Sequence, residues 1–138
     1  MKVFAGKFIR KLLEESPKKN GALVLALAGE LGSGKTTFAQ GAAFALGIEE
    51  KVLSPTFVIV KSYTIQNATH RIQHLVHIDC YRLENDQDML ALGWDNIVSD
   101  PANLVLVEWP ERIKAILPEN TIFLSFETTG EHERRILC

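Results

Sequence analysis

The chain has 138 residues, of which 46% are hydrophobic and 23% charged, and its formal net charge at pH 7 is −2. These values fit one globular domain with a hydrophobic core, and they argue against broad binding to a nucleic-acid backbone. The two cysteines form no C-x-x-C pair, which argues against a disulfide framework or a zinc site. The longest apolar run, residues 22–28, is too short to span a membrane, so we expect a cytoplasmic protein without membrane contact.

The first half of the chain begins with an amphipathic helix. Apolar residues recur at four-residue spacing from Phe4 to Leu13, and Ser16-Pro17 ends the pattern. The uninterrupted apolar run 22–28 predicts a strand that is buried on both faces, as in a parallel sheet. Helix-forming residues follow over 35–46, and Gly47 is a natural helix end.

The middle of the chain alternates between strand and turn signals. Residues 56–65 and 71–79 are alternating and rich in β-branched side chains, and the polar residues 66–70 between them predict a hairpin turn. A helical pattern returns around residues 86–92, where Asn85 is a candidate N-cap.

The last third of the chain supplies further strands. Residues 103–109 predict a second strand buried on both faces, and Pro110 can open a short helix over 111–116. Two strand-like segments flank Thr129-Gly130, which predicts a closing hairpin. We therefore expect one α/β domain over residues 1–138 with a mixed, mainly parallel central sheet.

The stretch "GELGSGKTTF" contains the complete G-x-x-x-x-G-K-[ST] pattern between a predicted buried strand and a predicted helix. Glycines let successive backbone N–H groups surround a phosphate, and the helix start adds its positive dipole end. Lys35 would bridge the β- and γ-phosphates, Thr36 would bind Mg²⁺, and Thr37 could reach the α-phosphate. The predicted phosphate-binding residues are Gly29, Glu30, Leu31, Gly32, Ser33, Gly34, Lys35, Thr36 and Thr37. This pattern predicts the three-layer sandwich of a P-loop NTPase.

Two carboxylates end predicted strands on the edge where the phosphates would lie. Glu108 ends the strand at 103–109, where P-loop NTPases usually carry an Asp, and Asp79 ends the strand at 71–79. The antiparallel hairpin partner brings Thr56 to the same edge, where it could sense Mg²⁺ or the γ-phosphate. The sequence leaves open which acid binds the metal and which orients water. It also leaves open whether His77 orients Asp79 or only packs.

Four segments resemble those of the TsaE family in order and spacing, over about residues 5–128: "GELGSGKTTF", "SPTF", "HIDCYRL" and "LVLVEWPER". The resemblance implies a small ATPase that uses ATP/ADP and Mg²⁺ and supports threonylcarbamoyladenosine modification of tRNA. It implies a complex with a TsaD-type transferase and a TsaB-type subunit, with tRNA contacted only indirectly.

The resemblance also implies roles for individual residues. Lys35, Asp79 and Glu108 would be catalytic, and Thr36, Asp79 and Glu108 would bind the metal. Nucleotide contacts would come from residues 29–37, from Thr56 in a switch-like segment, and from Trp109 beside Glu108.

Two other classes of function remain open. A P-loop kinase for a small metabolite would need an acceptor pocket and an arginine-rich lid, whereas the adjacent pair Arg134-Arg135 lies in the terminal strand. A GTPase is disfavoured because no N-K-x-D guanine motif is present. In a nucleotide-dependent binding subunit, hydrolysis would be incidental and residues 54–57 would form the switch.

Overall fold

The computed structural model describes residues 2–15, 21–30, 34–53, 55, 58–66 and 71–127, together with the backbone of 128 and 134–137. Within these residues, six strands form one sheet in the order β2-β3-β4-β1-β5-β6. The strands are β1 (Leu23–Ala28), β2 (Val60–Thr64), β3 (His74–Asp79), β4 (Asn103–Glu108), β5 (Ile122–Thr128) and β6 (Arg134–Leu137). The helices are α1 (Lys2–Glu15), α2 (Lys35–Ala45), α3 (Asp86–Ala91), α4 (Trp94–Ser99) and the 3₁₀ helix η1 (Pro110–Ile116).

The sheet is mixed but mainly parallel. β1 pairs in parallel with β4 and β5, and β4 pairs in parallel with β3. The two outer strands are antiparallel, β2 to β3 and β6 to β5. This topology confirms the predicted α/β class and both predicted hairpin pairings, whose turns lie outside the described residues.

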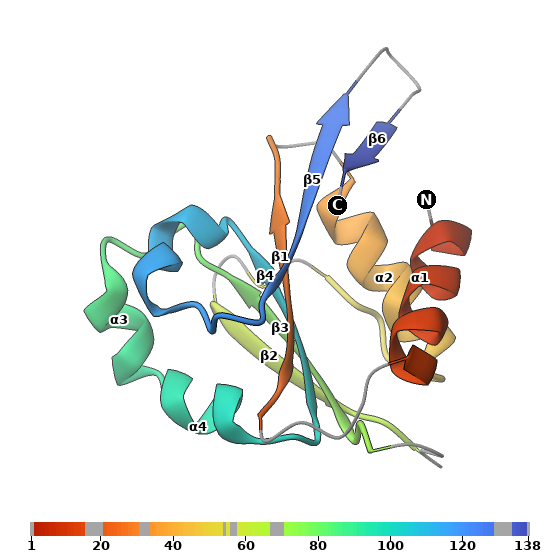
Figure 1. Cartoon of the computed structure of the whole chain (residues 1–138), viewed down its shortest axis with the longest axis horizontal. Coiled ribbons are helices and arrows are strands. Elements are labelled where there is room, and N and C mark those ends of the chain that lie inside the picture. The colour runs from red at the N-terminus through yellow and green to blue at the C-terminus, as the bar shows by residue number, and fades with distance from the viewer. Residues whose placement is uncertain are drawn as a thin grey trace.

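Helices cover both faces of the sheet, with α1 and α2 on one side and α3 and α4 on the other (Figure 1). Inward-facing leucines of β1, β3 and β4 pack with Ala5 and Ile9 of α1 and Phe38 of α2. The valines that alternate with them pack instead with Met89 of α3 and Trp94 of α4. Because β1 and β4 are buried on both faces, their sequences read as continuous apolar runs. The three-layer sandwich is therefore confirmed.

Several local predictions are also confirmed. Asn85 caps α3, since its Oδ1 accepts the backbone N–H of Asp88 at 3.2 Å. Gly47 follows α2 with a left-handed φ of 79°, as expected of a helix end. None of the described helices combines the length and apolar character needed to cross a membrane.

Other boundaries were wrong for identifiable reasons. The strand predicted at 56–65 begins only at Val60, because Ile59 adopts a left-handed φ of 68°. The strand predicted at 71–79 begins at His74, and the strand predicted at 103–109 ends at Glu108, since Trp109 has a φ of 57°. A helix that we did not predict, α4, is separated from α3 by Gly93, whose φ is 91°.

Helix α1 is held close to α2 by two glycines, of which Gly41 permits the closer approach. A Cβ at Gly41 would lie 2.7 Å from backbone atoms of Lys2 and 2.9 Å from the Cβ of Ala5. A Cβ at Gly6 would meet only the Cβ of Ala45, at 3.4 Å, which is ordinary contact.

We therefore expect Gly41→Ala to destabilise the protein by about 1–3 kcal/mol, the usual range for overpacking. The matched change Gly6→Ala should be neutral or stabilising by up to about 1 kcal/mol, because alanine favours the helix. Equilibrium unfolding in urea measures both values. Equal effects of the two substitutions would contradict this account of the α1–α2 contact.

Candidate functional site

The candidate site lies where β1, β4 and β3 end side by side. In the parallel register, Leu27 of β1 pairs with Glu108 of β4, and Glu108 pairs with Asp79 of β3. The loop that begins at Gly29 leaves β1 at this same edge. The structure thus brings the start of the predicted cradle beside both predicted acids. Thr56 lies outside the described residues.

The two ends of the predicted phosphate cradle have the backbone of a glycine loop. Gly29 has a φ of 149° and Gly34 a φ of 103°, and both values favour glycine. Gly34 is the N-cap of α2, and its carbonyl accepts the N–H of Phe38 at 2.8 Å. Leu31, Gly32 and Ser33 lie outside the described residues. Glu30 is exposed, while Thr36 and Thr37 lie half-buried in the first turn of α2.

The Lys35 side chain folds inward instead of extending into solvent. It is 4% exposed, and its Nζ donates a hydrogen bond to the carbonyl oxygen of Gly29. The same Nζ lies 3.9 Å from the ring centroid of Trp109, within range of a cation–π interaction. In this arrangement the Lys35 amine, which would bind a phosphate, contacts the Gly29 carbonyl and the Trp109 ring.

The charge of Lys35 is set by opposing effects. Burial lowers the pKa of Lys35 below its ordinary value of 10.5, which is the largest effect. The negative charges of Glu108, Glu111 and Asp79 raise it, in that order of size. Glu111 of η1 was not singled out in the sequence, because no motif marks it.

Glu108 connects the first turn of α2 with β3. Its Oε1 accepts a long contact of 3.5 Å from the Thr36 hydroxyl, and its Oε2 lies 2.5 Å from Nε2 of His77. Glu108 and His77 are both buried. The His77 ring therefore pairs with Glu108, and not with Asp79 as one of our two interpretations held. The two-residue spacing correctly placed His77 and Asp79 on the same face of β3, but it could not identify Glu108 as the partner of His77.

Asp79 is held at the same edge by backbone groups. Its Oδ1 accepts the N–H of Tyr81 at 2.9 Å, and its own N–H donates to the carbonyl of Ile59 at 2.9 Å. Burial raises the pKa of the neighbouring Cys80 thiol to about 12, so this cysteine is a buried hydrophobic residue and not a nucleophile.

Trp109 closes the site beside Glu108. Its left-handed backbone is uncommon for a residue with a side chain, and it turns the chain from β4 directly into η1. The Trp109 ring contacts the Tyr81 ring, with centroids 5.1 Å apart. Trp109 thus touches both the cradle lysine and an aromatic side chain that follows Asp79.

The oxygen atoms gathered here fit a hard cation. Thr36 offers a hydroxyl, and Glu108 and Asp79 offer carboxylates, which are the ligand types that Mg²⁺ prefers. Among the described residues, no group of three or more His, Cys, Asp or Glu is placed so that it could hold a metal ion. Magnesium in such a site would keep waters or phosphate oxygens as further ligands, as it usually does beside nucleotides.

Buried charge is concentrated at this edge. Among the described residues, the buried charged or polar side chains are Lys35, His77, Asp79, Asn103 and Glu108. Four of these five belong to the site. Burying such groups is unfavourable unless they are paired, so their clustering at the end of a sheet marks this edge as functional.

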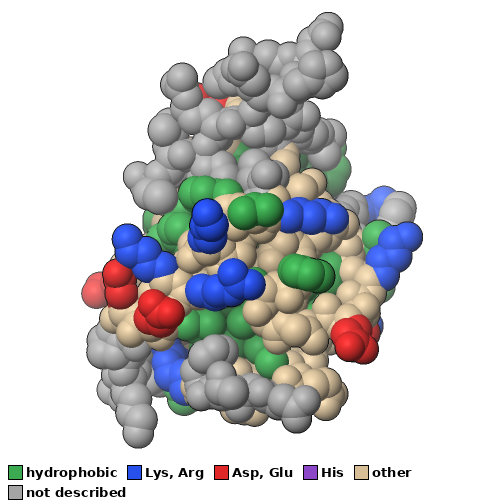
Figure 2. Space-filling view, turned by 90° about the vertical axis from the view of Figure 1, so that its right-hand side faces the viewer, with side chains coloured by type: hydrophobic (Ala, Val, Ile, Leu, Met, Phe, Trp, Pro, Cys, Tyr) green, Lys and Arg blue, Asp and Glu red, His purple; other side chains and the backbone are tan. Residues whose placement is uncertain are grey.

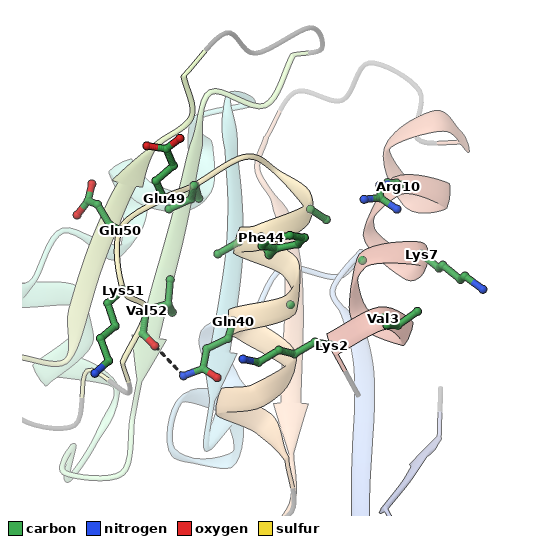
Figure 3. A pocket seen from close by; sticks show the side chains of 15 residues that line it. Lys2, Val3, Lys7, Arg10, Gln40, Phe44, Glu49, Glu50, Lys51 and Val52 are labelled. Atoms are coloured by element: carbon green, nitrogen blue, oxygen red, sulfur yellow. Dashed lines mark hydrogen bonds between the residues drawn. The ribbon is translucent and has the colours of Figure 1, made fainter.

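A separate cavity of about 640 Å³ lies between α1, α2 and residues 48–52. Figure 3 shows Gln40 of α2 reaching across it, where its Nε2 donates to the carbonyl of Val52 at 2.9 Å. Phe44 lines the cavity and is 81% exposed. Lysine and arginine side chains surround apolar ones on this face (Figure 2). Neither Lys35 nor the two acids line this cavity, so it is distinct from the cradle.

The solved structure of YdiB from Bacillus subtilis has a similar fold. The two chains align with a TM-score of 0.67 and 29% sequence identity, over 99% of this chain and 78% of the other. The agreement covers the whole described sheet and both helical layers, and it supports the P-loop-like architecture derived above.

Two curated relatives carry the name tRNA threonylcarbamoyladenosine biosynthesis protein TsaE. The protein from Treponema pallidum is 34% identical over 131 residues, which covers 95% of this chain and 87% of the relative. The protein from Bacillus subtilis is 39% identical over 113 residues, which covers 82% of this chain and 66% of the relative. The family described as threonylcarbamoyl adenosine biosynthesis protein TsaE matches residues 4–136. The chain therefore belongs to the TsaE family.

Proposed function

We propose that the chain is a Mg²⁺-dependent ATPase, weak by itself, that supports threonylcarbamoyladenosine modification of tRNA in the cytoplasm. It would act in a complex with a TsaD-type transferase and a TsaB-type subunit and would contact tRNA only indirectly. The carrying observation is that Lys35, Asp79 and Glu108, from three different elements, meet at one sheet edge beside the start of α2. The family of the chain supports the biosynthetic role.

The chemistry follows from where each group stands. Lys35 would leave the carbonyl of Gly29 to neutralise the β- and γ-phosphates. The Thr36 hydroxyl faces Glu108 Oε1, and these two residues would hold the metal. Bound Mg²⁺ would screen the charge on the phosphates. Asp79 lies one strand away and would orient the attacking water.

A second candidate is a nucleotide-dependent switch subunit in which hydrolysis is incidental. One observation favours it: the left-handed Ile59 lies between residues 54–57 and β2, and its carbonyl accepts the N–H of Asp79. Strained backbone beside a site is typical of segments that change conformation. A subunit of this class would bind its partner in the presence of ATP even when Glu108→Gln or Asp79→Asn has stopped turnover.

Phosphate release with and without the TsaD-type and TsaB-type proteins tests the main proposal. We expect slow release by the chain alone and faster release in the complex. Lys35→Ala should lower turnover by about 10²–10³-fold, the usual loss for a group that stabilises transition-state charge. Glu108→Gln should raise the Mg²⁺ requirement, and Asp79→Asn should lower turnover at saturating Mg²⁺.

Glu111→Gln is the matched control, because Glu111 acts on Lys35 through charge but is exposed and lies in η1. It should leave the Mg²⁺ requirement unchanged. If the Mg²⁺ concentration at half-maximal rate is the same in wild type, Glu108→Gln and Asp79→Asn, the metal assignment is wrong. If the partners do not stimulate release, the proposed assembly is wrong.

Nucleotide binding should also change tryptophan fluorescence. ATP would draw Lys35 away from the Trp109 ring, which removes a charge 3.9 Å from the ring centroid. We expect the change to disappear in Trp109→Phe and to persist in Trp94→Phe, because Trp94 is buried against α3 and η1 and donates to the carbonyl of Ile116. A response that follows Trp94 instead would contradict the proposed movement of Lys35.

Lys35→Met should lower turnover about as much as Lys35→Ala does, without destabilising the protein. Because burial lowers the pKa of Lys35 below 10.5, the unfolded chain binds more protons than the folded one between the lowered value and 10.5. The wild-type free energy of unfolding therefore gains from this group as the pH rises through that window. We expect Lys35→Met to be at least as stable as wild type at pH 7, with the difference shrinking toward pH 10.5. Urea unfolding at several pH values measures this, and a difference that widens with pH would contradict it.

A further inference from the structure

His77 is a polar residue in an otherwise apolar layer. It lies on β3 with its ring fully buried, and its register partner on β4 is Leu106. Leu75, two residues earlier on the same face, belongs to the core beneath α1 and α2. The polar group that the ring reaches is Glu108, with Nε2 lying 2.5 Å from Oε2.

Most buried side-chain nitrogens in folded proteins have a hydrogen-bond partner. Here Nδ1 of His77 has no hydrogen-bond partner, and it is the single buried side-chain nitrogen or oxygen in this condition among the described residues. Leaving such an atom unpaired destabilises the fold, and the compensating contact of this ring is the one that its other nitrogen makes with the buried Glu108 carboxylate. The hydrogen-bonding contact of this ring is therefore made through Nε2 alone.

The contact restrains a carboxylate that has more freedom than usual. P-loop NTPases commonly carry Asp at the end of this strand, and Glu has one more rotatable bond. With Oε2 held by His77, the remaining oxygen of Glu108, Oε1, faces the Thr36 hydroxyl. The ring therefore fixes which carboxylate oxygen is presented to the cradle.

We propose that His77 is a positioning residue that holds Glu108 in the orientation in which Oε1 and the Thr36 hydroxyl can share one magnesium ion. The His77–Glu108 contact stands on the geometry of the chain alone. Its consequence for metal binding rests on the proposed ATPase function. Groups that orient a metal ligand in this way typically change metal affinity or activity by about 10–100-fold when removed.

The contact itself is tested on the ligand-free protein by ¹H–¹⁵N nuclear magnetic resonance. Nε2 faces a carboxylate, so it carries the proton, and we expect a downfield, slowly exchanging Nε2–H signal from His77. The signal should be lost in Glu108→Ala. If the signal is absent from the wild-type protein, or survives in Glu108→Ala, the proposal is overturned.

The consequence is tested with two replacements of His77. In His77→Gln the amide nitrogen reaches the position of Nε2 and keeps the donor, whereas His77→Leu fills the space without one. We expect His77→Leu to lower kcat about 10–100-fold and to raise the Mg²⁺ concentration at half-maximal rate. His77→Gln should keep a kcat and a Mg²⁺ concentration at half-maximal rate close to those of wild type. His77→Leu and His77→Gln should bind Mg²⁺-free ATP like wild type.

Three results would count against the proposal. Wild-type kcat and Mg²⁺ dependence in His77→Leu would show that the donor is not needed, and equal impairment of both folded variants would show that the ring itself matters. If His77→Leu does not fold, His77→Asn replaces it, since its amide stops at the position of Nδ1, and an unimpaired His77→Asn would overturn the proposal. A wild-type chain that hydrolyses no ATP would end the proposed function, while the resonance experiment would still decide the contact.

Discussion

The parallel register of β3, β4 and β1 is the constraint on which the site depends. Because the three strands run in the same direction and end together, Asp79, Glu108 and the loop after β1 meet without any long connection. Each strand is buried on both faces, so a slip of one residue would move its side chains from one core to the other, where they do not fit, and would separate the acids. The packing that stabilises the fold is thus the same packing that aligns the functional groups.

The site residues are placed at some expense to the fold. Four buried charged or polar side chains cluster at one edge, and two residues with side chains, Ile59 and Trp109, take left-handed backbone conformations beside it. Such conformations are unfavourable by about 1–3 kcal/mol each and persist only when the surroundings impose them. Ile59 lies beside the end of β3, where its carbonyl accepts the N–H of Asp79, and Trp109 lies at the end of β4, where the chain turns directly into η1. Stability and function therefore pull in different directions at this edge.

Local patterns in the sequence predicted the glycine loop, the two strand-end acids and the three-layer α/β class, because glycine spacing and apolar runs carry that information directly. The partner of His77 could not be predicted, since a buried contact between β3 and β4 depends on inter-strand register and on side-chain rotamers. The strand ends near Ile59 and Trp109 were missed because both residue types favour strands, and only the tertiary turn overrides that preference. The break between α3 and α4 lies at Gly93. It was missed because a single glycine within a helical pattern does not by itself predict the end of a helix.

Groups of the chain itself would compete with a phosphate for the Lys35 amine. The Gly29 carbonyl and the Trp109 ring both contact the Lys35 amine, so a phosphate that binds this amine would compete with them. The apparent affinity for phosphate is then the intrinsic affinity multiplied by the fraction of molecules in which the Lys35 amine is free. The Gly29 carbonyl and the Trp109 ring belong to the same chain, so they can contact the Lys35 amine again whenever a phosphate leaves it. Under the proposed ATPase function, this contact would weaken the binding of ADP as well as that of ATP.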